Sequence, residues 1–331
     1  MRSMLLVAAV LSTMIIGGCG AKAGYFFSSL TNPLEPSKVQ LRDGVETLSY
    51  SFVIGDAPEA ETVLFFLPGS GCSSLKYYLR KYLEGLEGNI RVFAMQKRHV
   101  NNGTTGIFGC PEGFDEWNHF PQWVDDHDWF VNKTLAGLPY KPKHILLLGV
   151  SEGGSVASAL AARNPAVTHL AMIGHGGMKQ ADELRLLMSK QYPKLDMDGE
   201  LAKVLAEPGN IEKHFLGQTY KYWAGQAFVD PLQFLLPLPV PIIVGFGTED
   251  RSVPVESARL LERRFQEAGK SNLALELYPG ADHFLVGKDG TDYRPVFLKA
   301  LSKWLLNKGR PLDRVRLPKT TTGAELWEKR P

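Results

Sequence analysis

The distribution of apolar residues along the chain changes character near residue 61. Before it, residues 38–44 and 45–56 alternate apolar and polar positions, as an antiparallel pair of strands does. After it the apolar runs are continuous and often end in glycine. Continuous runs are typical of strands covered on both faces, and so of a parallel sheet between two layers of helices. The runs cover residues 61–71, 90–96, 144–151, 168–177 and 241–250.

Segments with helical spacing of apolar residues separate these runs. This order of strand, helix and strand predicts the α/β class, with a mostly parallel sheet and helices on both of its faces. Residues 178–237 interrupt the order with helical and aromatic stretches, so we expect a helical cap inserted into a domain that spans residues 38–307. The predicted helices of the two layers are residues 73–88, 120–137, 153–165 and 255–270.

The composition says little more about the class of protein. Hydrophobic residues make up 44% and charged residues 22% of the 331 residues, as in an ordinary globular protein. The formal net charge of +2 is too small to suggest a nucleic-acid partner. The length suits an α/β enzyme with an insertion. The polar, proline-containing residues 308–331 are expected to form a C-terminal tail.

The first residues predict export. Arg2 precedes an apolar stretch too short to cross a bilayer comfortably, and small residues follow it, which is the layout of a signal peptide over residues 1–18. Residues 16–19, Ile-Gly-Gly-Cys, resemble the lipobox of bacterial lipoproteins. That resemblance implies acylation of Cys19, a lipid anchor in a membrane of the cell envelope or periplasm, and a linker over residues 19–37. The alternative is an ordinary signal peptide with an incidental cysteine.

A serine at the junction of a predicted strand and a predicted helix is the candidate nucleophile. Residues 144–149 form the strand, the helix starts at Gly153, and Ser151 lies between them in the pattern Gly-x-Ser-x-Gly. Such a turn strains the serine and exposes its Oγ at the carboxyl end of the sheet. The glycines are needed because a Cβ at Gly149 or Gly153 would collide with the neighbouring strand or helix. The alternative is a small residue tolerated at a tight turn.

A serine nucleophile requires a base, and the base requires an acid that orients it. At this kind of turn the expected chain order is serine, acid, histidine, with the acid and the histidine following later strands. Asp250 follows the run that starts at residue 241, and His283 follows a strand that starts at Leu273. Glu249 competes with Asp250 but is expected to point to solvent. Asp282 is adjacent to His283 and so is poorly placed to reach its Nδ1.

Three motifs in this order resemble the α/β-hydrolase superfamily, and in detail its serine esterase and peptidase branch related to the catalytic domain of prolyl oligopeptidase. The resemblance covers roughly residues 61–306. It implies an α/β-hydrolase fold, a triad of Ser151, Asp250 and His283, and no metal or organic cofactor. The motifs are Gly-Val-Ser-Glu-Gly-Gly at 149–154, Gly-Thr-Glu-Asp at 247–250 before Val-Pro, and Gly-Ala-Asp-His at 280–283.

An enzyme of this kind needs an oxyanion hole with two N–H donors. The resemblance implies that the backbone N–H of Glu152 is one of them. The second is expected from the loop after the first buried strand, at Ser70, with Gly71 as second choice. The loop departs from the superfamily pattern because Pro68 replaces the histidine of the common His-Gly motif.

If Cys19 is acylated, two cysteines remain. In an exported protein an even number of remaining cysteines favours a disulfide. We therefore predict a bridge between Cys72 and Cys110 that holds the oxyanion loop rigid. Two unrelated buried thiols are the alternative.

Other polar and aromatic segments have competing interpretations. The charged runs at 97–99 and 125–128 could suggest a metal or phosphate site, but no ligand set with metal spacing accompanies them, and solvated charge is the better interpretation. His175 is expected to be structural or to line a pocket. The stretch 220–228 either lines an apolar acyl pocket or packs the cap.

These residues predict a serine hydrolase that acts on a small-molecule ester or a peptide. Hydrolysis of a carboxylic ester or thioester is the favoured activity. A peptidase of the prolyl oligopeptidase type is second, because it would need a site for the peptide; Glu152 and Glu249 are candidate partners for an amino terminus. The third alternative is an envelope lipoprotein that uses the fold to bind a partner without catalysis.

Overall fold

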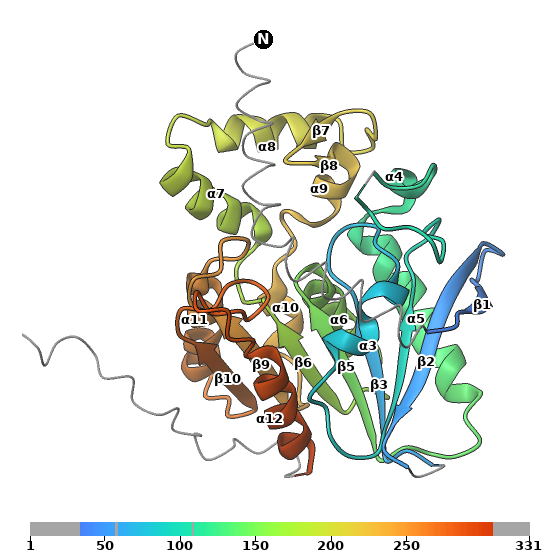
Figure 1. Cartoon of the computed structure of the whole chain (residues 1–331). Coiled ribbons are helices and arrows are strands. Elements are labelled where there is room, and N and C mark those ends of the chain that lie inside the picture. The colour runs from blue at the N-terminus through green and yellow to red at the C-terminus, as the bar shows by residue number, and fades with distance from the viewer. Residues whose placement is uncertain (1–33, 57–58, 108, 307–331) are drawn as a thin grey trace, which may run out of the picture.

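The computed structural model describes residues 34–56, 59–107 and 109–306. Its centre is an eight-stranded sheet in the order β1-β2-β4-β3-β5-β6-β9-β10 (Figure 1). β2 is antiparallel to β1 and β4, and the other neighbouring strands are parallel, which confirms the predicted fold class. The strands are β1 Ser37–Gln40, β2 Glu46–Ile54, β3 Thr62–Leu67, β4 Ile90–Met95, β5 His144–Val150, β6 His169–Ile173, β9 Ile242–Gly247 and β10 Leu273–Tyr278.

The register aligns apolar side chains in rows across the sheet. One row runs from Phe65 through Leu147, Leu170 and Ile242 to Leu273 on five successive strands. The first four of these side chains are buried in one hydrophobic cluster, and Leu273 packs against it. Covered rows of this kind explain why the runs are continuously apolar.

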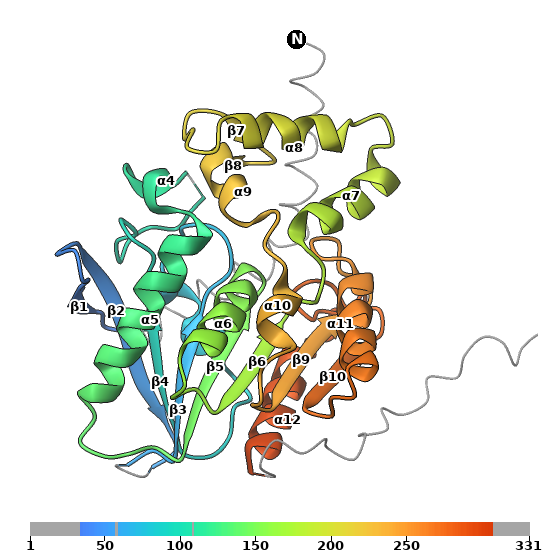
Figure 2. The same cartoon turned by 180° about the vertical axis from the view of Figure 1, so that it is seen from behind.

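Helices cover both faces of the sheet (Figures 1 and 2). Along β3, the side chains of Val63, Phe65 and Leu67 belong to the cluster that contains α5, α6 and α11, whereas Leu64 and Phe66 belong to the cluster that contains α3 and α12. The alternation places successive residues of one strand in two different cores. The helices of these layers are α3 Leu79–Tyr82, α5 Phe120–Ala136, α6 Glu152–Arg163, α10 Pro231–Leu235, α11 Val255–Glu267 and α12 Arg294–Leu306.

The helix predicted over residues 73–88 is wrong in extent. The segment contains only a 3-10 turn, Leu75–Tyr77, and the single turn α3. Gly85 has φ +105°, and a Cβ there would lie 2.6 Å from the carbonyl oxygen of Pro295. The chain must therefore leave the helical conformation where it meets the start of α12, a helix that the sequence analysis did not identify.

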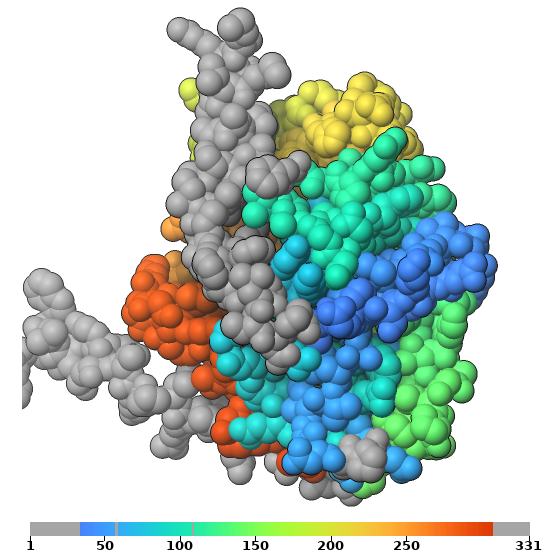
Figure 3. All heavy atoms as spheres, turned by 45° about the vertical axis from the view of Figure 1, so that its right-hand side comes forward, coloured from blue at the N-terminus to red at the C-terminus, as the bar shows by residue number. Residues whose placement is uncertain are grey.

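The chain between β6 and β9 forms a layer above the carboxyl ends of β5 and β6 (Figures 1 and 2). We call residues 180–226 the cap. It contacts the segment around α4 Phe114–Trp117 (Figure 3). At this contact Asn118 donates to Gln218, and Lys221 donates to the backbone carbonyl of Glu116. α10 packs against α6 instead. The cap contains α7 Gln180–Gln191, α8 Met197–Ala206, the hairpin β7 His214–Phe215 and β8 Gln218–Thr219, and α9 Tyr220–Gln226.

The predicted signal peptide, Cys19 and the tail at 308–331 lie outside the described residues. Of the predicted linker, Leu34 is buried in the core and Ser37 begins β1, so these two residues belong to the folded body. Within the described ranges, none of the helices has the length and apolar character needed to span a membrane.

Candidate active site

Ser151 occupies a strained turn between β5 and α6. Its backbone has φ 54° and ψ −124°, a conformation that non-glycine residues rarely adopt. The turn is held at both ends of the residue, because the Ser151 N–H donates to the Ile173 carbonyl at 2.8 Å and the Ser151 carbonyl accepts from the Gly154 N–H at 2.8 Å. The serine side chain therefore lies at the carboxyl end of the sheet.

The glycines around the serine permit this close packing. A Cβ at Gly149 would lie 2.3 Å from the carbonyl oxygen of Gly153 in α6. A Cβ at Gly153 would lie 2.2 Å from the carbonyl oxygen of Leu67 in β3. The expected collisions with the helix and the neighbouring strand are confirmed at both positions.

Asp250 and His283 form the second part of the site. Asp250 Oδ2 lies 2.6 Å from His283 Nδ1, and Asp250 Oδ1 accepts the backbone N–H groups of Ser252 and Val253. The carboxylate side chain is fully buried, and 11% of the imidazole surface is exposed. With a proton on Nδ1, the imidazole keeps Nε2 as an acceptor.

The imidazole of His283 lies beside the strand that holds Ser151 in place. A Cβ on Gly174, the residue after β6, would lie 2.8 Å from His283 Cε1, and the preceding residue, Ile173, accepts the Ser151 N–H. Among the described residues, no hydrogen bond joins Ser151 Oγ to His283, an interaction that often tightens only when substrate binds. Burial lowers the pKa of His283, but the charge and hydrogen bond of Asp250 outweigh it and raise that pKa above its ordinary value.

The loop after β3 approaches the serine closely. A Cβ on Gly69 would lie 3.3 Å from Ser151 Cβ and 3.9 Å from Ser151 Oγ, so only a glycine fits without displacing its neighbours. Ser70 follows and lines the same pocket as Ser151 and Glu152, and Gly71 turns the chain at φ +96°. Within the described residues, no protein acceptor takes the backbone N–H of Glu152 or Ser70.

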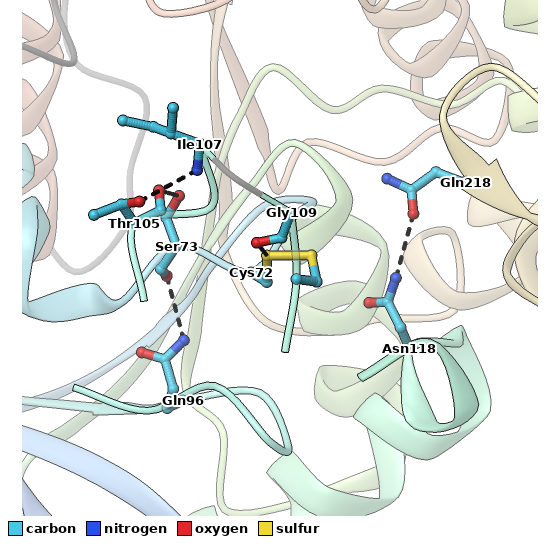
Figure 4. Close-up of a disulfide and its surroundings, with 9 residues drawn as sticks. Cys72, Ser73, Gln96, Thr105, Ile107, Gly109, Asn118 and Gln218 are labelled. Atoms are coloured by element: carbon cyan, nitrogen blue, oxygen red, sulfur yellow. Dashed lines mark hydrogen bonds between the residues drawn. A yellow bond between two sulfur atoms is a disulfide. The ribbon is translucent and has the colours of Figure 1, made fainter. Parts of the chain in front are cut away.

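A disulfide fixes the end of this loop. Cys72 and Cys110 are bonded with their Cα atoms 5.5 Å apart. Gln96, just after β4, donates to the Ser73 carbonyl and accepts the Leu75 N–H. Figure 4 shows the disulfide together with the hydrogen bond from Gln96 to Ser73 and the pair of Asn118 and Gln218. The loop after β3 is thus tied covalently to the segment that carries α4.

In the charged run at 97–99, Lys97 and Arg98 are buried, contrary to the expectation of solvated charge, whereas His99 is exposed. Lys97 is 5% exposed, and its Nζ lies 3.3 Å from Glu152 Oε1 and 3.7 Å from the centre of the Trp123 ring. Tyr222 of the cap donates its hydroxyl to Glu152 Oε2 at 2.8 Å. Burial raises the pKa of Glu152 and lowers that of Lys97. The side chain of Glu152, the residue after Ser151, therefore belongs to a buried network that joins the end of β4, α6 and α9.

The charged run at 125–128 is also partly buried. Asp126 accepts two hydrogen bonds from the Arg98 guanidinium, each 2.7 Å long, and His127 contacts the Trp123 carbonyl at 2.9 Å. Asp125 is exposed, and Asp128 is partly buried and accepts hydrogen bonds from Asn132 and Asn164. The interpretation as solvated charge is wrong for Asp126 and His127 because each has a partner in the interior.

A pocket opens beside Ser151 under the cap. Four of its side chains are apolar, and the others are polar. In the aromatic stretch 220–228, Tyr222 lines the pocket, whereas Trp223 packs inside the cap and donates to the Phe215 carbonyl. The aromatic stretch thus serves both the pocket and the cap. The polar lining residues are Ser70, Ser151, Glu152, Ser155, His175, Gln180, Glu183, Tyr222 and Gln226.

The family of the chain follows from its sequence. A model of the alpha/beta hydrolase family matches residues 64–293, which is more than half of the chain. The chain belongs to the alpha/beta hydrolase family. No curated protein sequence matches this alpha/beta hydrolase significantly.

Solved structures similar to this alpha/beta hydrolase include esterases and a peptidase. Est1E from Butyrivibrio proteoclasticus has a TM-score of 0.57 and 15% identity, over 82% of this chain and 98% of that one. An esterase from Pyrococcus furiosus has a TM-score of 0.57 and 16% identity, over 85% and 93%. Acylaminoacyl peptidase from Pyrococcus horikoshii has a TM-score of 0.55 and 13% identity, over 84% of this chain but 42% of the peptidase. At such identities the likeness shows the fold alone.

Sequence reasoning missed Lys97 and Glu183 as parts of this alpha/beta hydrolase site, whereas Gln226 lies in the stretch 220–228 that was expected to line a pocket or pack the cap. A signal existed for Lys97, because it directly follows an apolar run and so lies at the carboxyl end of a parallel strand, where sites of α/β sheets gather. Glu183 and Gln226 belong to the cap, whose docking no local pattern determines. Among the described residues, no three His, Cys, Asp or Glu side chains are grouped as a metal ion requires.

Proposed function

We propose that this protein is a serine hydrolase that cleaves a carboxylic ester or thioester through an acyl-enzyme on Ser151. The observation that carries the proposal is the 2.6 Å contact between Asp250 and His283 beside the strained turn of Ser151. The expected chain order of serine, acid and histidine agrees with this arrangement.

In the proposed mechanism, His283 Nε2 takes the proton of Ser151 as Oγ attacks the substrate carbonyl. Asp250 holds Nδ1–H and stabilises the imidazolium that forms. The backbone N–H groups of Glu152 and Ser70 stabilise the negative oxygen of the tetrahedral intermediate. His283 then protonates the leaving alcohol or thiol, and water releases the acyl group by the same steps in reverse order.

Ester hydrolysis is favoured over peptidase activity by the state of the two glutamates that could bind an amino terminus. Glu152 already has Lys97 and Tyr222 as partners in the interior. Glu249 is exposed and lies 3.5 Å from Lys288. Neither carboxylate is left unpaired for a substrate amine.

We also propose that the protein is exported and anchored in an envelope membrane through acylated Cys19. The support is the sequence of residues 1–19 together with the disulfide between Cys72 and Cys110, since disulfides persist in oxidising compartments.

The choice of substrate class is tested by kinetics on the full-length protein in detergent, with p-nitrophenyl acetate and butyrate compared with aminoacyl p-nitroanilides. Hydrolysis of the esters, with kcat/KM at least about 100-fold above that of the anilides, is the expected result. Ser151→Ala is the control for uncatalysed background. Faster cleavage of the anilides would establish the peptidase alternative, and no turnover of either class would favour the binding protein.

A further inference from the structure

The pocket beside Ser151 contains more buried hydrogen-bonding groups than a triad requires. His175 Nε2 is buried and has no hydrogen-bond partner among the described residues. Gln226 Nε2 is also buried, and of its two N–H groups one can donate to the Tyr222 hydroxyl, which leaves the other without a partner in the described part of the chain; both side chains line the pocket. Such orphaned groups are rare, because each loses its contacts with water without replacement. Two of them around one pocket indicate that a ligand supplies the missing partners.

The fold holds these groups in place. A Cβ on Gly154, in the first turn of α6, would lie 2.5 Å from His175 Cβ, so the glycine allows the imidazole to pack against the helix next to Ser151. Glu183 accepts a 2.7 Å hydrogen bond from Ser257 Oγ and is 6% exposed. The polar lining is therefore built into the core contacts and does not belong to a mobile surface.

The pocket carries no net charge near neutral pH. Burial lowers the pKa of His175 to about 4, so the imidazole is uncharged. Burial also raises the pKa of Glu183 to about 8, with a contribution from the charge of Asp250, so this carboxyl group is protonated. Glu152 and Lys97 carry opposite charges that cancel. A charged ligand would find no counter-charge here.

The pocket lies on the acyl side of the scissile bond in the proposed mechanism. Its lining includes Ser151 and both proposed oxyanion donors, Glu152 and Ser70, whereas His283 is not among the described residues that line it. The leaving group must depart next to His283, which protonates it. The cavity measures about 60 Å³, well below the roughly 300–1,000 Å³ of sites for drug-sized molecules, so it has room only for a short acyl group.

We propose that this pocket binds a short, uncharged acyl group that carries a hydroxyl group, so that the substrate is a hydroxyacyl ester. This inference rests on the proposed function of Ser151. The hydroxyl oxygen accepts a hydrogen bond from Gln226 Nε2 or pairs with His175 Nε2, and the acyl carbons contact the few apolar side chains. A long aliphatic acyl chain would leave His175 Nε2 and one N–H group of Gln226 unpaired.

The test compares acyl groups on a constant leaving group, with the full-length protein in detergent. We expect kcat/KM for p-nitrophenyl 3-hydroxybutyrate to exceed that for p-nitrophenyl butyrate by about tenfold, the effect of one hydrogen bond to a buried group. Gln226→Met removes the donor at similar volume and should abolish most of this preference. Gln233→Met, the same change at an exposed position of α10, should leave the preference intact.

A binding measurement separates this inference from the proposed catalysis. By calorimetry, Ser151→Ala should bind methyl 3-hydroxybutyrate more tightly than methyl butyrate by a similar factor, and this does not depend on turnover or on the folding of Gln226→Met. Equal affinities, or a preference for the unsubstituted or octanoyl ester, would overturn the inference while leaving a serine esterase intact. Discrimination in binding without hydrolysis of any ester would instead refute the proposed function alone.

Discussion

At the scale of single residues, the site depends on a serine held in a backbone conformation that serine rarely adopts. A non-glycine residue at φ 54° costs about 1–3 kcal/mol, and the surrounding structure must supply that energy. Here the hydrogen bonds of the Ser151 backbone and the glycine contacts at 149 and 153 leave no room for relaxation. The strain thus presents Oγ to the pocket before any substrate arrives.

The pKa of His283 gives a prediction at this scale. Because Asp250 raises that pKa above 6.5, the imidazole gains its proton, and loses its function as a base, at a pH above the ordinary value. We expect kcat/KM for an ester to fall as the pH decreases, with a midpoint above 6.5. A pH profile from 4.5 to 9 measures this. A flat profile, or a midpoint well below 6.5, would mean that His283 is not the base.

At the scale of elements, the buried network of Lys97, Glu152 and Tyr222 connects the central sheet, the turn that holds Ser151, and the cap. Lys97 follows β4, Glu152 begins α6, and Tyr222 belongs to α9. The backbone N–H of Glu152 is the proposed oxyanion donor, so the network positions that donor through its own side chain. The cap and the catalytic turn are therefore expected to be coupled.

Removing one charge of the ion pair between Lys97 and Glu152 leaves the other charge buried without a partner. Lys97→Met should reduce the free energy of unfolding by about 3–5 kcal/mol. The double variant Lys97→Met, Glu152→Gln removes both charges and should recover much of that loss. Urea unfolding of the wild type and the two variants measures both values. If Lys97→Met alone is as stable as the wild type, the pair is not the stabilising contact described here.

The disulfide gives a second prediction for an element. It closes a loop of 38 residues, which corresponds to roughly 4 kcal/mol of stabilisation in the chain-entropy model. Replacing Cys72 and Cys110 together by serine should lower the melting temperature and reduce kcat/KM, because the loop that carries Ser70 loses its covalent tie. Ser51→Ala, at an exposed position of β2, is the control. An unchanged kcat/KM in the double variant would show that the loop is positioned without it.

At the scale of the whole molecule, the sequence predicts the sheet and the place of the cap in the chain, but not the contacts that the cap makes. Continuous apolar runs identify five parallel strands, because a strand that is covered on both faces needs apolar residues at consecutive positions. The cap and α12 have weaker signals, since their positions depend on contacts such as Gly85 with Pro295. The buried charges of Lys97 and Asp126 were missed because their partners, Glu152 and Arg98, are far away in sequence.

The predicted anchor also concerns the molecule as a whole. With Cys19 acylated, the protein expressed in a bacterial host should sediment with membranes and enter the detergent phase on Triton X-114 partitioning. Cys19→Ser should shift it to the aqueous phase without changing its ester hydrolysis. Intact mass spectrometry of the mature protein measures the acyl chains directly. A wild-type protein that partitions into water would identify an ordinary signal peptide.

Labelling with a fluorophosphonate probe tests the central claim most directly, because it reports an activated serine whatever the substrate. We predict that full-length wild-type protein is labelled on the peptide containing Ser151, that Ser151→Ala is not labelled, and that Asp250→Asn reacts more slowly by up to about 10⁴-fold. Folding of each variant is checked by circular dichroism. If the folded wild type stays unlabelled, or carries the label on another residue, Ser151 is not the nucleophile and the protein does not act as proposed.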